Sequence, residues 1–372
     1  MAAGAFKYED DLLKHYVRVK GWLRLCRDRK TRLQSRKPKY RRRLRYFTFC
    51  AVNAVDVLML DVARVVTRSD TGRFDTVYYF DRTPELVAET EHRIPGSVGF
   101  AGNFLETVLA PIMLGDPLAP PGAEPDRADV RRRQTLQATR RAFEASFPFD
   151  VLNLDLEDMT FKAKDPIPGD VIRALRRLCE WQRQPLRGKW GLETLGGFTL
   201  LFTTRVGPAE LADDYMAMLL NSLNRNIAAD DSLAVSLHRR NGLDVTQLLR
   251  QDFGTFFELG VPKIIADVLM EEDWHIEPDP GVMTFRFTRG GSSPYEIVHF
   301  AMNVIRQSPP RDARAPGTTP DTVRTSYTLC MRQLFDTAAV RVTDALAKSA
   351  KLEPSLAEIK DRRRQYYSDE MT

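Results

Sequence analysis

Long apolar runs are missing from this 372-residue sequence. No stretch of about 18 consecutive apolar residues occurs, so the sequence predicts no transmembrane helix. The first residues are acidic and amphipathic, without the basic start and the short apolar stretch of a secretion signal. We therefore expect a cytoplasmic protein with no membrane partner.

Cysteine and histidine are also scarce. The four cysteines, Cys26, Cys50, Cys179 and Cys330, lie far apart and form no CxxC motif. This spacing argues against a disulfide framework and against a zinc ribbon. The five histidines are scattered and form no HExxH motif, so we predict no metal site.

Positive charge is concentrated near the start of the chain. Residues 14–45 contain fifteen lysines and arginines and one acid, Asp28, which gives this segment a charge of +14. Because the whole chain carries +5, the rest carries −9. Such a segment attracts phosphate backbones, so we predict DNA or RNA contacts here. The candidate contact residues are Lys37, Lys39, Arg41, Arg42 and Arg43. A solvated helix face, or contact with an acidic protein, is the alternative.

The middle of the chain alternates strand patterns with helix patterns. Helical spacing of apolar residues follows most of the predicted strands, with Asn53 and Thr83 as expected helix N-caps. Such alternation predicts a Rossmann-like α/β domain with a doubly wound, mostly parallel sheet. The predicted strands are 45–52, 76–80, 97–101, 149–156 and 197–203, and the predicted helices are 53–66, 83–93, 130–146 and 170–184.

After Pro208 the pattern becomes mainly helical. Helical spacing at 209–227 and at 244–271 predicts a helical insertion at about 209–271. A DPG turn between residues 275–278 and 282–288 predicts an antiparallel hairpin, and 294–306 has a helical pattern. The domain plan is a basic helical segment at 1–43, the α/β domain at 44–306, a Pro-rich linker at 307–323 and a helical tail at 324–372.

One part of the predicted domain resembles a known family. Residues 77–106, VYYFDRTPELVAETEHRIPGSVGFAGNFLE, are similar to the middle of class I S-adenosylmethionine-dependent methyltransferases. The segments FDVLNLDL and GGFTLLFTTRV resemble the fourth and fifth strands of that family, and the hairpin at 275–288 would supply its last two strands. The resemblance spans roughly residues 44–306 and implies S-adenosylmethionine as the cofactor.

The resemblance also assigns cofactor contacts. Asp81 stands at the position that binds the ribose hydroxyls, and Asn103 stands near the adenine edge. A carboxylate at the carboxyl end of a strand can accept two hydrogen bonds from a vicinal diol. Ala51 and Asn53 would line the methionine side of the cofactor. The loop that contains them, residues 50–54, has no glycine, whereas the family's first loop is usually glycine-rich.

The end of the fourth predicted strand carries the candidate catalytic residues. Asn153 and Asp155 would face the substrate. If the methyl acceptor is an exocyclic amine, they would hydrogen-bond it and orient its lone pair toward the methyl group. One alternative is a catalytically inactive methyltransferase-like subunit that binds nucleic acid or assembles with partner proteins in a complex. Another is metal-dependent phosphoryl transfer or nuclease activity, with Asp155 and Glu157 as Mg²⁺ ligands.

Overall fold

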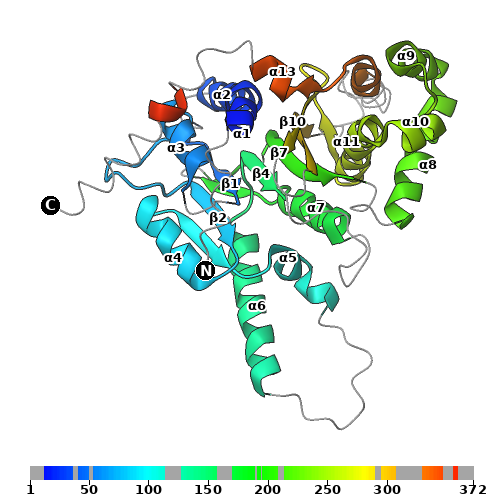
Figure 1. Ribbon diagram of the computed structural model, residues 1–372. Helices are drawn as coiled ribbons and strands as arrows, with labels where there is room; N and C mark the ends of the chain where they lie inside the picture. Colours follow the sequence, from blue (N-terminus) through cyan, green and yellow to red (C-terminus); the bar gives the residue numbers. More distant parts are fainter. Residues whose placement is uncertain are drawn as a thin grey trace, which may run out of the picture.

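A computed structural model describes residues 12–36, 41–49, 53–113, 127–156, 170–188, 191–193, 195–207, 213–289, 295–306, 329–346 and 355–358. Within these ranges a nine-stranded, mostly parallel sheet lies between two layers of helices (Figure 1). The predicted Rossmann-like α/β fold is therefore confirmed. The predicted linker at 307–323 lies outside the described residues.

The strand order along the sheet is β11-β9-β10-β7-β4-β1-β2-β3, and β8 also pairs with β10. Five strands form the parallel half, in the order β3-β2-β1-β4-β7. The order of these strands reverses between β1 and β4, which is where doubly wound sheets bind ligands. The five strands are β1 (Tyr46–Thr48), β2 (Val77–Asp81), β3 (Val98–Ala101), β4 (Val151–Asp155) and β7 (Gly197–Val206).

Helices connect most of these strands much as the sequence predicts. Thr83 caps α4, because its hydroxyl accepts a hydrogen bond from the Leu86 amide, as predicted. The predicted cap at Asn53 is wrong, since the N-cap of α3 is Ala54. A short pair of strands, β5 (Leu186–Gly188) and β6 (Gly191–Glu193), was not predicted. The connecting helices are α3 (Val55–Val62), α4 (Pro84–Arg93), α5 (Phe104–Met113), α6 (Arg127–Ala145) and α7 (Asp170–Trp181).

The antiparallel half differs from the prediction. The helix predicted at 294–306 is wrong, because Tyr295–Arg306 is the long strand β10, which pairs with β7 on one side. The predicted hairpin at 275–288 is also wrong. β8 (Trp274–Ile276) and β9 (Val282–Arg289) both pair with β10, in succession along its other side. The hairpin of this sheet is therefore β9–β10.

The described part of the predicted helical insertion, residues 213–271, forms the helices α8 (Asp213–Ala229), α9 (Asp231–Asn241), α10 (Val245–Gln251) and α11 (Phe253–Glu271). The single helix expected at 244–271 divides at Asp252, whose carboxylate accepts a hydrogen bond from the Thr255 amide and caps α11. The sequence prediction missed α9.

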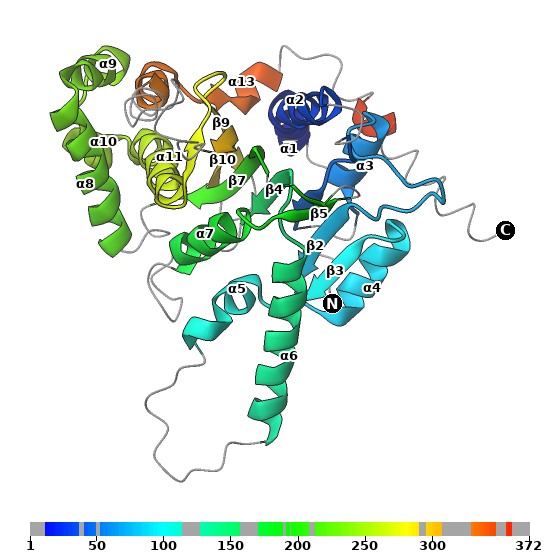
Figure 2. The same cartoon turned by 180° about the vertical axis from the view of Figure 1, so that it is seen from behind.

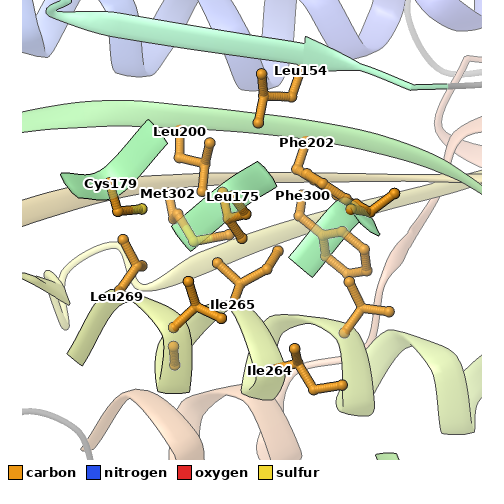
Figure 3. Packing of buried hydrophobic residues seen from close by; sticks show 14 of the residues in the cluster. Leu154, Leu175, Cys179, Leu200, Phe202, Ile264, Ile265, Leu269, Phe300 and Met302 are labelled. Atoms are coloured by element: carbon orange, nitrogen blue, oxygen red, sulfur yellow. The ribbon is translucent and has the colours of Figure 1, made fainter. Parts of the chain in front are cut away.

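Apolar side chains cover both faces of the sheet. One face packs against the N-terminal helices and α3, and the other packs against α5, α6, α7 and the insertion (Figure 2). Figure 3 shows side chains of α7 and α11, among them Leu175, Ile265 and Leu269, that face the second side of the sheet. None of the described helices has the length and apolarity needed to cross a bilayer.

The two ends of the described chain meet on the first face. The N-terminal helix consists of α1 (Leu12–Val17), the π-helical segment η2 (Arg18–Trp22) and α2 (Leu23–Gln34). In the predicted helical tail, residues 329–336 are helical, but residues 340–341 form the edge strand β11 before α13 (Val342–Leu346). α13 contacts α1, so the tail packs against the N-terminal helix.

Candidate functional site

Asp81 and Asn103 lie close together at the carboxyl ends of β2 and β3. Asp81 is the last residue of β2 and pairs in register with Ala101 of β3. Its backbone oxygen accepts a hydrogen bond of 2.9 Å from the Gly102 amide, and its side chain accepts one of 2.6 Å from the Arg82 amide. Partial burial raises the pKa of the Asp81 carboxyl above its usual value. The carboxylate is half-buried at the edge of the sheet.

Asn103 has a structural role in the described residues. Its side-chain oxygen accepts a hydrogen bond of 3.2 Å from the Glu106 amide, which satisfies one of the unpaired N–H groups at the start of α5. The residue is exposed, so it is also accessible from solvent next to Asp81. The structure brings these two predicted cofactor residues to one edge.

The loop before α3 contains a left-handed residue. Ala54 has a φ of 46° and is fully buried, although left-handed backbone costs a non-glycine residue roughly 1–2 kcal/mol. At this position the chain adopts a left-handed conformation that usually favours glycine, although the residue is alanine. Asn53 accepts a hydrogen bond of 2.9 Å from Arg93 of α4, and Ala51 lies outside the described residues.

Asn153 belongs to a buried hydrogen-bonded cluster that also contains Tyr46, Thr48 and Asp56. The Asn153 amide nitrogen donates to the hydroxyl oxygens of Tyr46 and Thr48, at 3.0 Å each. Both hydroxyls donate to one carboxylate oxygen of Asp56, at 2.7 Å. Burial, followed by the negative charge of Asp56, raises the pKa of the Tyr46 hydroxyl. Among the described residues, the Asn153 side-chain oxygen has no hydrogen-bond partner.

The prediction from sequence missed Asp56. The available signal was one acid inside the apolar helical run VDVLML, where a charged residue needs a partner once it is buried. The partners of Asp56 come from β1 and β4, which are neighbouring parallel strands. Phe47 of β1 pairs in register with Leu152 of β4, so the residues that follow them, Thr48 and Asn153, also lie side by side. Periodicity alone carries no information about which strands are neighbours.

Asp155 is paired with the N-terminal helix. The Lys14 ammonium nitrogen lies 2.5 Å from an Asp155 carboxylate oxygen, and the two side chains are 9% and 13% exposed. Nearby on the same face, the Thr203 hydroxyl lies 2.6 Å from Nδ1 of His299, whose ring packs edge-on against Trp22 at 5.9 Å. The N-terminal helix therefore covers the carboxyl end of β4, where the substrate-facing side chains were predicted.

Several arginines of the basic segment form ion pairs with acids of the same chain. Both terminal nitrogens of Arg42 contact the fully buried carboxylate of Asp150, one of them at 2.8 Å. Arg29 lies 3.8 Å from the same carboxylate, and burial lowers the pKa of Arg29 to about 10. Arg43 pairs with Asp75 at 2.5 Å.

The other predicted nucleic-acid residues differ in their setting. Arg41 is exposed and donates a hydrogen bond of 3.3 Å to the backbone oxygen of Arg36. Lys37 and Lys39 lie outside the described residues. The fold thus uses part of the predicted basic surface for internal ion pairs.

The described residues contain no group of three or more histidines, cysteines or acids placed to hold a metal ion. Of the residues that the structure describes, those lining a groove of about 840 Å³ belong to α8, and no predicted site residue is among them. The carboxyl edge of the sheet thus has an accessible part at β2 and β3 and a covered part at β4.

A scan against protein-family models, a search of curated proteins and a search of solved structures all find no match to this chain.

Proposed function

We propose that this protein is an S-adenosylmethionine-dependent methyltransferase-like protein that acts on or binds nucleic acid. The observation that carries the proposal is the half-buried carboxylate of Asp81 at the end of β2, one strand away from the switch point of a doubly wound sheet. A carboxylate in that position can accept both hydroxyls of a ribose. The sheet order β3-β2-β1-β4-β7, completed by the antiparallel pair β10–β9, also supports the proposal.

The residues at this edge fit such a cofactor. Asp81 would hold the ribose, and the exposed side chain of Asn103 would lie near the adenine. The left-handed turn at Ala54 lets the chain turn sharply before α3 with only a methyl side chain, which suits the close approach of a ligand to the backbone. The bound cofactor would supply a methyl group on a positively charged sulfur.

A second candidate is a methyltransferase-like protein that does not transfer a methyl group. Two observations favour it. Asn153 uses its amide nitrogen within the Tyr46–Thr48–Asp56 cluster, and Asp155 is covered by Lys14. Both predicted catalytic side chains are thereby engaged, whereas the cofactor edge at Asp81 is accessible. Such a protein would bind cofactor and nucleic acid as a subunit of a complex.

Calorimetric titration of the full chain with S-adenosylmethionine and S-adenosylhomocysteine tests the cofactor site. We expect saturable binding that Asp81→Ala weakens by at least about tenfold, because a charge-assisted hydrogen bond contributes about 1.5–3 kcal/mol. Asp81→Asn should weaken binding less than Asp81→Ala. Only the ionised carboxylate accepts hydrogen bonds from both ribose hydroxyls, so cofactor affinity should fall as the pH drops through the pKa of Asp81. Because that pKa is raised, the fall should occur at a higher pH than for an ordinary aspartate.

Asp70→Ala is the matched control, because Asp70 is an exposed acid in a turn. Equal losses in the Asp70 and Asp81 variants, or no binding to the wild-type chain, would reject the cofactor site. Transfer of a labelled methyl group to DNA or RNA then separates the two candidates. Cofactor binding without transfer favours the inactive subunit, and transfer that Asn153→Ala removes favours the enzyme.

A further inference from the structure

Helix α6 extends outward from the body of the protein in both views (Figures 1 and 2). Its last turns are anchored in the core, where the ring of Phe143 lies 5.0 Å from the rings of Phe47 and Phe100. Towards its beginning, residues 131–135 are all exposed. The helix is therefore held at one end and presents the other to solvent.

Arginine dominates the exposed part of α6. Residues 130–145 contain five arginines and one acid, Glu144. Among the described residues, Arg131, Arg133 and Arg141 have neither an ion pair nor a hydrogen bond from the side chain. This surface differs from the basic segment at 14–45, where Arg42 and several others face acids of the same chain.

The remaining exposed side chains of α6 are polar or small, among them Gln134, Thr135 and Gln137. The large exposed hydrophobic residues in the described ranges are Val98, Val235, Leu329 and Val340, and none belongs to α6. Protein interfaces are usually organised around aromatic or aliphatic anchors. Arginine on phosphates, with glutamine and threonine near base edges, is instead typical of nucleic-acid contacts. The composition therefore favours a nucleic acid over an acidic protein.

We propose that α6 binds in the major groove of duplex DNA, with Arg131, Arg133 and Arg141 on the phosphates. A helix with its side chains is about 10–12 Å wide, which matches a B-form major groove of about 12 Å. The ten helical steps from Arg131 to Arg141 span about 15 Å along the helix axis, enough to reach several phosphates. Duplex RNA does not fit, because its major groove is too narrow for side chains to enter.

The position of α6 connects this surface to the cofactor edge. Arg132 pairs with Glu106 of α5 at 3.1 Å, and the Glu106 amide donates to the side chain of Asn103. DNA on α6 would therefore lie beside Asn103 and Asp81. The inference deepens the nucleic-acid part of the proposed function and rests on it for its biological meaning, whereas DNA binding by α6 does not require the cofactor.

Fluorescence anisotropy with a labelled short DNA duplex, without cofactor, tests the proposal on the full chain. The variant R131E/R133E/R141E should bind at least about tenfold more weakly than wild type, and the slope of log affinity against log salt should fall by about 3, since each lost phosphate contact contributes about 0.9. The control R173E/R239E/R250E makes the same charge change at exposed arginines on α7, α9 and α10 and should stay close to wild type.

Four results overturn the proposal. The first two are the absence of duplex DNA binding by wild type and equal losses of affinity in both triple variants. The third is tighter binding of duplex RNA or single-stranded DNA than of duplex DNA. The fourth is binding of polyglutamate as tight as that of duplex DNA. The last result would identify α6 as a surface for acidic proteins. Circular dichroism of both variants confirms that they are folded. Because no cofactor is present, failure of the cofactor titration and failure of this experiment are separate outcomes.

Discussion

At the scale of single residues, the ion pair between Lys14 and Asp155 links the N-terminal helix to the sheet. Both side chains are about nine-tenths buried, so replacing one partner removes an opposite charge from direct contact with a poorly hydrated ion. The pair also determines whether Asp155, at the end of β4, can contact a substrate, because a carboxylate in contact with an ammonium group is not available to one.

We predict that Lys14→Met lowers the free energy of unfolding by about 3 kcal/mol, since the Asp155 carboxylate stays buried. The double variant Lys14→Met/Asp155→Asn should recover part of this loss, with a coupling energy of about 1–3 kcal/mol. Urea unfolding measures both values. Arg176→Met is the control, because the Arg176–Glu271 pair has a similar distance of 2.5 Å but is 46% and 53% exposed. It should change stability by less than about 1 kcal/mol, and an equal loss at both pairs would contradict the argument.

At the scale of elements, the N-terminal helix depends on one close contact. Gly21 lies in η2, and a Cβ added there would stand 2.7 Å from the ring of Phe285 in β9. The contact is too short for any side chain, so only glycine allows the helix to lie this close to the strand. Trp22 follows directly and packs its buried ring against His299 of β10.

Gly21→Ala should therefore destabilise the protein by about 1–3 kcal/mol, the usual cost of an added methyl group in a packed interior. Amide hydrogen exchange should show the largest loss of protection in α1 and α2. Gly196→Ala offers a comparison, since a Cβ there would meet only an arginine side-chain nitrogen at 3.8 Å. If the two variants were equally stable, the helix would not need this close approach.

At the scale of the whole molecule, two apolar clusters share the sheet. Cys26 lies in the cluster under the N-terminal helix, and Cys179 and Cys330 lie in the cluster under the insertion. Burial raises the pKa of all three thiols, that of Cys330 to about 12. Because the thiolate is the reactive form, these groups are protected as long as both layers stay packed.

A Cys50→Ser variant should consequently show no reaction with DTNB at neutral pH in the folded state, and three reactive thiols after unfolding in urea. Labelling of the three thiols should follow one common transition when the two clusters unfold together. Mass spectrometry of partly labelled protein identifies the order in which the three cysteines react. Early labelling of Cys26 alone would show that the N-terminal layer opens independently of the insertion.

The sequence by itself determined the fold class and most of the parallel half. Alternating short apolar strands and amphipathic helices allow few topologies, because parallel strands require crossover connections. Thr83, followed by Pro84, located the start of α4 from local backbone chemistry alone. The acid at the end of β2 could likewise be placed at the edge of the sheet, since it follows directly from the end of a strand.

Only the tertiary structure decided the antiparallel half and the state of the candidate site. Residues 297–304 are all buried in β10, and a fully buried strand has no alternation that separates it from a buried helix. The partners of Asn153, Asp155 and Arg42 are distant in sequence, at Asp56, Lys14 and Asp150. Local patterns record which side chains are polar, but the packing of the N-terminal helix on the sheet determines which charges remain for a ligand.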